Sequence, residues 1–269
     1  MIGRSVATVW LGVLAFLLGY AEVPPARAAA DPVRMDTALV PGGRFQSILP
    51  APKGQAITTV AKFHMDRRPV TQGEFLAFVR AHPQWQRGRS PALFTDSHYL
   101  STWQDALALG PQVSADQPVT GVSWFAARAY CEARGARLPT WLEWEYVAAA
   151  DEAHADARAT AAWQQQILNW YSRPSNQPLP PVGRGAPNLY GIYDLHGLVW
   201  EWVEDAGSLM MGTDNREAGN ADVLKFCGTG ALALENREAY AIAMRVAMLS
   251  SLQARDTTTN LGFRCAATP

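Results

Sequence analysis

The sequence predicts an α+β fold that is rich in loops. Its 269 residues include 21 glycines and 18 prolines, a content that favours turns and short elements. Short runs that have the pattern of strands precede segments with helix-start signals. Ten tryptophans and a hydrophobic content of 48% provide the apolar surface for one large domain or two small ones.

Two predicted helices begin with a capping box, in which a threonine caps the helix and a glutamate in its first turn closes the box. These boxes are Thr71 with Glu74 and Thr140 with Glu143. Ser123 is the N-cap of a third helix, and Gly135 is a suitable stop for it. The helices are expected over residues 75–80, 141–150 and 124–134.

The expected strands lie before the first helix. Residues 41–45 form a turn that leads into a strand, and residues 60–65 alternate weakly. Residues 82–116 follow no periodic pattern and are interpreted as a surface insertion. The two histidines of this segment, His82 and His98, lack the paired spacing of metal ligands, so we expect them to be solvated.

The charge of the chain is balanced. It carries 23 lysines and arginines against 24 aspartates and glutamates, and the basic residues form no run or stripe. This composition argues against nucleic acid or an acidic membrane surface as the main partner.

Residues 1–30 have the pattern of a signal peptide. Arg4 supplies a positive start, residues 6–20 are apolar, and residues 28–30 are alanines that fit a cleavage site. The apolar run is short for a membrane span, so no stable span is expected after cleavage. Residues 31–269 are then a mature domain in the periplasm or outside the cell. The alternative is an uncleaved membrane anchor.

Residues 188–205, NLYGIYDLHGLVWEWVED, contain a cluster of oxygen donors. Their mixed carboxylate and carbonyl character is the one that calcium prefers. The donors are Asp194, Gly197, Val199 and Glu201. The alternative is that Asp194 caps a turn and that Glu201 pairs with an arginine.

The chain contains three cysteines, Cys131, Cys227 and Cys265. An oxidising compartment favours one disulfide and leaves one thiol over. The spacing does not assign the pair.

These motifs resemble the formylglycine-generating enzyme (sulfatase-modifying factor) family. Residues 188–205 are similar to its GLYDMxGNVWEW signature, with Leu198 in place of the usual asparagine. Residues 122–150 match its run from VSW to RLPTEAEWEY, and residues 260–265 match its NxGFRC ending. The resemblance covers residues 41–266. It implies one domain with the loop-rich α+β fold of the family, which is similar to that of C-type lectins.

The resemblance also implies a disulfide and metal sites. The family bridges the cysteines that match Cys131 and Cys265, which leaves Cys227 as the free thiol. It holds a structural calcium at the positions that match the four oxygen donors named above. Asn169 resembles a residue of another calcium loop of the family.

Formylglycine-generating members of the family bind copper(I) through two cysteines and use oxygen to oxidise a substrate cysteine. Two thiolates suit this soft ion. The matching residues 231–245 contain no cysteine, which argues against formylglycine formation. Cys227 is either a reactive, catalytic or copper-binding thiol or a small buried residue. Met244 and Met248 lie on one face of a helix and either complete a soft copper site or fill the core.

The resemblance therefore implies an exported accessory or maturation factor that acts on another exported protein or peptide, by oxidation or through copper. The turn at Cys227 and the run before the NLGFRC ending are most similar to a NirV-like sub-branch of the family. The alternative is a catalytically inactive, calcium-stabilised module that binds a peptide or a glycan. Arg245 is either a residue of the substrate groove or half of a structural ion pair.

Overall fold

In the computed structural model, residues 34–269 form one compact unit. The structure describes residue 1 and residues 36–49, 57–171, 178–208 and 237–269. The expected signal peptide and Cys227 lie outside the described residues. Within the described part, no helix has the length and apolar character that crossing a membrane requires.

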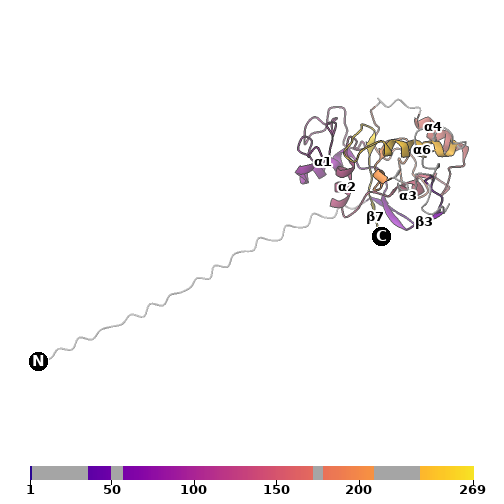
Figure 1. The fold of residues 1–269 in the computed structure, drawn as a ribbon, viewed down its shortest axis with the longest axis horizontal. Helices are drawn as coiled ribbons and strands as arrows, with labels where there is room; N and C mark the ends of the chain where they lie inside the picture. Colours follow the sequence, from indigo (N-terminus) through magenta and orange to yellow (C-terminus); the bar gives the residue numbers. More distant parts are fainter. Residues whose placement is uncertain (2–35, 50–56, 172–177, 209–236) are drawn as a thin grey trace, which may run out of the picture. The chain divides into compact units, whose positions relative to one another are not determined.

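Along the described residues, the first short strands precede the helices, and further short strands flank the last α-helix (Figure 1). The strands are β1 (Thr37–Val40), β2 (Gly43–Phe45), β3 (Thr58–Val60), β4 (Phe63–Asp66), β5 (Trp200–Glu201), β6 (Leu261–Gly262) and β7 (Ala266–Ala267). The α-helices are α1 (Gln72–Ala81), α2 (Trp124–Ala133), α3 (Trp141–Ala148), α4 (Ala161–Tyr171) and α6 (Arg237–Ser250). The part of the chain that the structure describes also contains the short 3-10 helices η2 (Pro83–Trp85) and η3 (Ala206–Ser208).

The strands of the described residues pair in small sheets. β1, β4 and β7 form an antiparallel sheet, β2 and β3 form an antiparallel pair, and β5 and β6 are parallel. Because β4 lies between β1 and β7, this sheet joins the N-terminal part of the unit to the end of the chain. The predicted α+β class is confirmed.

The helix starts agree with the predicted caps. The Thr71 side chain accepts the backbone N–H of Glu74, whose carboxylate accepts the Thr71 N–H at 2.8 Å, so a capping box precedes α1. Thr140 and Glu143 repeat this arrangement before α3, and Ser123 caps α2. α3 ends earlier than predicted.

The weak alternation over residues 60–65 does not correspond to one strand. β3 ends at Val60 and β4 begins at Phe63, and the two strands belong to different sheets. The chain changes sheets between them, which the side-chain pattern does not show.

Residues 82–116 are irregular, as predicted, but they are not only a surface insertion. Trp103 is 2% exposed and its indole N–H donates to the side-chain oxygen of Gln72 at 2.7 Å. The segment therefore contributes to the core, because a buried indole needs such a partner. His98 is exposed, as expected, whereas His82 stacks on an aromatic ring of α1.

Helices α4 and α6 pack against each other (Figure 1). Helix α4 was not predicted from the sequence, although Thr160 caps its start by accepting the backbone N–H of Trp163 at 3.3 Å. Through α4 and α6, two late segments of the chain cover the region around β5. Residues 188–205, which carry the predicted calcium donors and are called the donor-rich loop below, lie in this region.

Candidate functional site

The disulfide between Cys131 and Cys265 ties α2 to the segment between β6 and β7. The Cα atoms lie 5.6 Å apart across a sequence separation of 134, and both residues are at most 1% exposed. This is the pairing that the family resemblance implies. In the chain-entropy model, closing so long a loop stabilises the folded state by about 5 kcal/mol.

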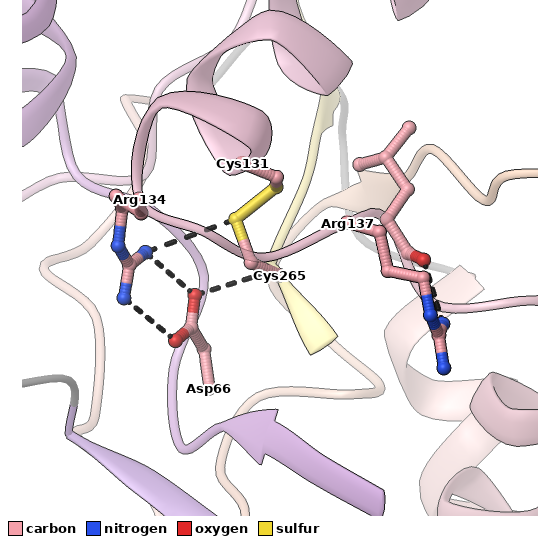
Figure 2. Close-up of a disulfide and its surroundings, with 6 residues drawn as sticks. Asp66, Cys131, Arg134, Arg137 and Cys265 are labelled. Carbon is pink, nitrogen blue, oxygen red and sulfur yellow. Dashed lines mark hydrogen bonds and ion pairs between the residues drawn. A yellow bond between two sulfur atoms is a disulfide. The ribbon is translucent and has the colours of Figure 1, made fainter. Parts of the chain in front are cut away.

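A partly buried ion pair lies beside the disulfide (Figure 2). The Arg134 guanidinium donates to the two carboxylate oxygens of Asp66 at 2.9 and 3.0 Å. One of these oxygens also accepts the backbone N–H of Cys265 at 3.0 Å. Burial raises the pKa of Asp66, and the charge of Arg134 opposes this shift. The pair thus holds β4, the end of α2 and the C-terminal segment together.

The loop before β5 turns through three residues with positive φ, the first of which is Gly191 with a φ of 74°. Asp194 has a φ of 60° and Gly197 has a φ of 98°. An aspartate tolerates the left-handed region, whereas a side chain at the position of Gly197 would strain the backbone. The Asp194 carboxylate accepts the backbone N–H of Gly183 at 2.5 Å, and burial raises the pKa of this carboxyl group.

Glu201 lies at the centre of a buried polar cluster behind this loop. Its carboxylate is inaccessible to solvent and accepts hydrogen bonds from the Arg264 guanidinium at distances between 2.7 and 3.0 Å. It also accepts the indole N–H of Trp144 at 2.8 Å. Arg264 is equally buried and donates to the carbonyl oxygen of Tyr193 at 2.9 Å. Glu201 therefore has the arginine partner that the simpler interpretation of the sequence allowed.

Arg245, in α6, is 2% exposed. Its guanidinium donates to the carbonyl oxygen of Glu201 and lies 3.5 Å from the centroid of the Trp144 ring, a cation–π contact. The side chain supports the polar cluster from the side of α6. Its role in a substrate groove stays a prediction.

His196 is a member of this region that the sequence analysis did not single out. Its Nε2 lies 2.8 Å from the carbonyl oxygen of Ala148, and the rings of Trp144 and Trp163 meet it edge to face. Burial lowers the pKa of His196 to about 4. A lone histidine carries no spacing signal, so only the folded arrangement reveals this environment.

The oxygens expected to bind calcium fit the ion in part. The carbonyl oxygens of Gly197 and Val199 accept no hydrogen bond from any residue that the structure describes. Asp194 uses one carboxylate oxygen for its bond to a backbone N–H, which leaves the other as a ligand. The Glu201 carboxylate does not fit, because the hydrogen bonds described above occupy both of its oxygens. Calcium at this loop stays a prediction that rests on three donors.

Asn169 lies in α4 and is exposed. Its side-chain oxygen accepts a hydrogen bond from Gln165, one turn earlier, at 2.9 Å. The next residue, Trp170, reaches the donor-rich loop, where its ring centroid lies 5.2 Å from that of Trp200. A second calcium site at Asn169 stays a prediction.

A cleft of about 310 Å³ opens beside α2 and η3. Its apolar lining residues include Trp124, Phe125, Trp202, Leu252 and Ala254. Hydrogen bonds from the indole N–H groups to the carbonyl oxygens of Val122 and Val203, both at 2.9 Å, hold the two tryptophans in place. The cleft is therefore lined by aromatic side chains in fixed positions and lies next to the donor-rich loop and β5.

Two acidic residues complete this cleft. Asp205 accepts the backbone N–H of Trp141 at 2.7 Å, and burial raises the pKa of Asp205. One carboxylate oxygen of Glu204 is buried and has no hydrogen-bond partner among the described residues. Its other oxygen lies 3.8 Å from the Arg128 guanidinium. The cleft thus offers a hydrogen-bond acceptor that a bound donor group would satisfy.

The model of the Sulfatase-modifying factor enzyme 1-like domain matches residues 23–269. The chain belongs to this family. It is 29% identical to the formylglycine-generating enzyme of Streptomyces coelicolor, over 91% of this chain and 93% of that protein. It is also 29% identical to the inactive C-alpha-formylglycine-generating enzyme 2 of Mus musculus, over 88% of this chain and 86% of that protein. The structure of PvdO from Pseudomonas aeruginosa aligns with a TM-score of 0.47 at 17% identity, over 87% of this chain and 94% of that chain.

Membership of the sulfatase-modifying factor family does not by itself assign catalysis. Proteins described as a formylglycine-generating enzyme and as an inactive one both match this chain over most of its length. Leu198, the departure from the family signature, is 8% exposed and buried. An apolar residue here is therefore accommodated by packing.

Proposed function

We propose that this chain is an exported accessory or maturation factor that acts on a partner protein and does not itself make formylglycine. The observation that carries this proposal is the disulfide. The sequence contains three cysteines, and the disulfide occupies Cys131 and Cys265. One chain therefore retains only the thiol of Cys227, whereas a two-thiolate copper(I) site needs a second one.

The cleft beside α2 supports a role in binding a partner. A cleft lined by partly buried aromatic side chains next to a few polar groups is typical of sites that hold a peptide or a small ligand. A volume of about 310 Å³ accommodates one or two side chains of an extended segment. The acceptor on Glu204 favours a hydrogen-bond donor, so the expected segment combines an apolar anchor with a lysine or arginine.

A peptide display experiment tests the role of the cleft. Random peptides are selected on the wild-type protein and then measured against Glu204→Gln and, as a control, Glu152→Gln, which changes an exposed residue. We expect enriched peptides that pair an apolar residue with a basic one, and weaker binding only in the Glu204 variant. Peptides without basic residues, or equal binding by both variants, would contradict the role of the cleft.

A conversion assay tests the absence of formylglycine formation. The purified protein is loaded with copper(I) and incubated in air with a cysteine-containing peptide of the kind that formylglycine-generating enzymes oxidise. We expect the peptide to remain unchanged by mass spectrometry. Formation of an aldehyde at the cysteine would refute the proposal.

Copper binding through Cys227 distinguishes a maturation factor that uses a metal from a module that only binds a partner. Copper per chain is measured for the wild-type protein and for Cys227→Ser after the same loading and washing. Copper that is lost on substitution supports a maturation factor that uses this thiol. Equal copper in both proteins supports the second candidate, a catalytically inactive module that binds a peptide or a glycan. The match to an inactive mouse relative favours that candidate.

Export is the part of the proposal that rests on residues 1–30. Intact-mass measurement of the protein from a native-like host should show a mature chain that begins near Asp31 in the fraction outside the cytoplasm. A cytoplasmic chain that retains Arg4 would contradict export.

A further inference from the structure

A second hollow, of about 560 Å³, lies where the irregular segment of residues 82–116 meets the segment before β6. Arg87, Ser90, Asp96 and Tyr99 line it from the first segment, and Arg255 lines it from the second. The backbone N–H of Asp96 donates to the carbonyl oxygen of Arg255 at 3.1 Å, which joins the two walls. Residues that are far apart in sequence therefore form the hollow, and a backbone hydrogen bond holds its two walls together.

Two guanidinium groups give this hollow a positive charge. Neither Arg87 nor Arg255 forms an ion pair with a carboxylate among the described residues. Arg87 uses one of its N–H groups for the carbonyl oxygen of Trp103 and keeps further donors. Arg255 is exposed. Both groups therefore retain donors for an anion.

The one carboxylate in the lining does not neutralise both arginines. Asp96 accepts hydrogen bonds from the backbone N–H and the hydroxyl of Thr257, at 2.9 and 2.6 Å, and from the backbone N–H of His98 at 2.9 Å. Its acceptor positions are directed to these groups. With two arginines against one aspartate, the lining carries an excess positive charge.

Ser90 adds an unsatisfied polar group to the same lining. Its hydroxyl oxygen is buried and has no hydrogen-bond partner among the described residues. A buried hydroxyl without a partner is unfavourable, and a bound oxygen atom would remove this cost. The hydroxyl and the remaining N–H groups of the two guanidinium groups together can donate hydrogen bonds to a bound anion.

We propose that this hollow is a binding site for an oxyanion, a carboxylate or a phosphate carried by a small organic ligand. Guanidinium and hydroxyl donors are the groups that hold such anions with charge-assisted hydrogen bonds. A volume of about 560 Å³ lies within the range of small-molecule sites and exceeds the needs of an inorganic ion. The site shares no lining residue with the aromatic cleft and does not depend on the function proposed for that cleft.

Calorimetric titration with inorganic phosphate and, separately, with succinate tests this site. The proteins compared are the wild type, Arg255→Gln and Arg89→Gln. Arg89 is an exposed arginine of the same segment that does not line the hollow, so it controls for general surface charge. Thermal unfolding of each variant confirms that its fold is retained.

We expect saturable binding of at least one probe to the wild type and binding at least roughly tenfold weaker to Arg255→Gln, because a charge-assisted hydrogen bond is lost. Arg89→Gln should bind as the wild type does. The probe that binds more tightly distinguishes a phosphate ligand from a carboxylate ligand. Absence of saturable binding of both probes, or an equal loss in both variants, would overturn the proposal.

Discussion

The carboxylate of Glu201 and the guanidinium of Arg264 form an ion pair in which neither side chain is exposed to solvent. The indole N–H of Trp144 donates a further hydrogen bond to the Glu201 carboxylate, and the Arg264 guanidinium donates one to the carbonyl oxygen of Tyr193. Burial of two charges is tolerated only with such complete hydrogen bonding. This pair joins β5 to the C-terminal segment beneath the donor-rich loop.

Removing one member of this pair should destabilise the fold strongly. Replacement of the guanidinium in Arg264→Met leaves the Glu201 charge buried without its partner, and such a loss typically costs about 3–5 kcal/mol. The free energy of unfolding is measured by urea denaturation. Arg68→Met is the matched control, because its ion pair with Glu74 is partly exposed and is worth at most about 1 kcal/mol. Equal losses in the two variants would contradict the structural role of the buried pair.

Calcium should stabilise the protein through the loop before β5. An ion that binds only the folded chain raises its melting temperature, by an amount that grows with the concentration of the free ion. We expect this increase with calcium in the wild type and not in Asp194→Asn, which removes the charged donor of the loop. Glu152→Gln changes an exposed acidic residue and should keep the response. A melting temperature that is insensitive to millimolar calcium would argue against the site.

His196 should make stability depend on pH. Its pKa falls from 6.5 to about 4 on folding, chiefly because of burial. Below pH 6.5 the histidine is therefore protonated in the unfolded chain but stays neutral in the folded chain. The contribution of His196 to the free energy of unfolding decreases as the pH falls to about 4. Above pH 6.5 the contribution is constant.

The difference in free energy of unfolding between the wild type and a His196 variant isolates the pH effect of this residue. Buried carboxyl groups such as Asp66 and Asp194, whose pKa values burial raises, change stability in the opposite direction in acid. We therefore compare the wild type with His196→Gln by urea denaturation at a series of pH values. The difference should shrink or change sign between pH 6.5 and about 4. A difference between the wild type and His196→Gln that stays constant over this pH range would contradict the shifted pKa.

The local parts of the fold follow from the sequence more closely than the long-range ones. The capping boxes at Thr71 and Thr140 depend on residues three positions apart, and both form as predicted. The pairing of Cys131 with Cys265 was predicted from the family resemblance, because the spacing of the cysteines does not assign the pair.

The buried polar cluster was less accessible to sequence reasoning. Glu201 and Arg264 are 63 positions apart, and neither carries a local signal that selects the other as its partner. The burial of Trp103 was missed for a similar reason, since an irregular segment does not show which of its residues face inward. His196 likewise acquires its shifted pKa only from rings that the fold brings around it.

Counting free thiols tests most directly whether the chain can form a two-thiolate copper site. The unreduced protein is denatured and titrated with a thiol reagent, and the disulfide is then mapped by proteolysis and mass spectrometry. We expect one free thiol per chain, at Cys227, and three after reduction, because Cys131 and Cys265 are bonded to each other. Three free thiols before reduction, or a disulfide that includes Cys227, would contradict this arrangement.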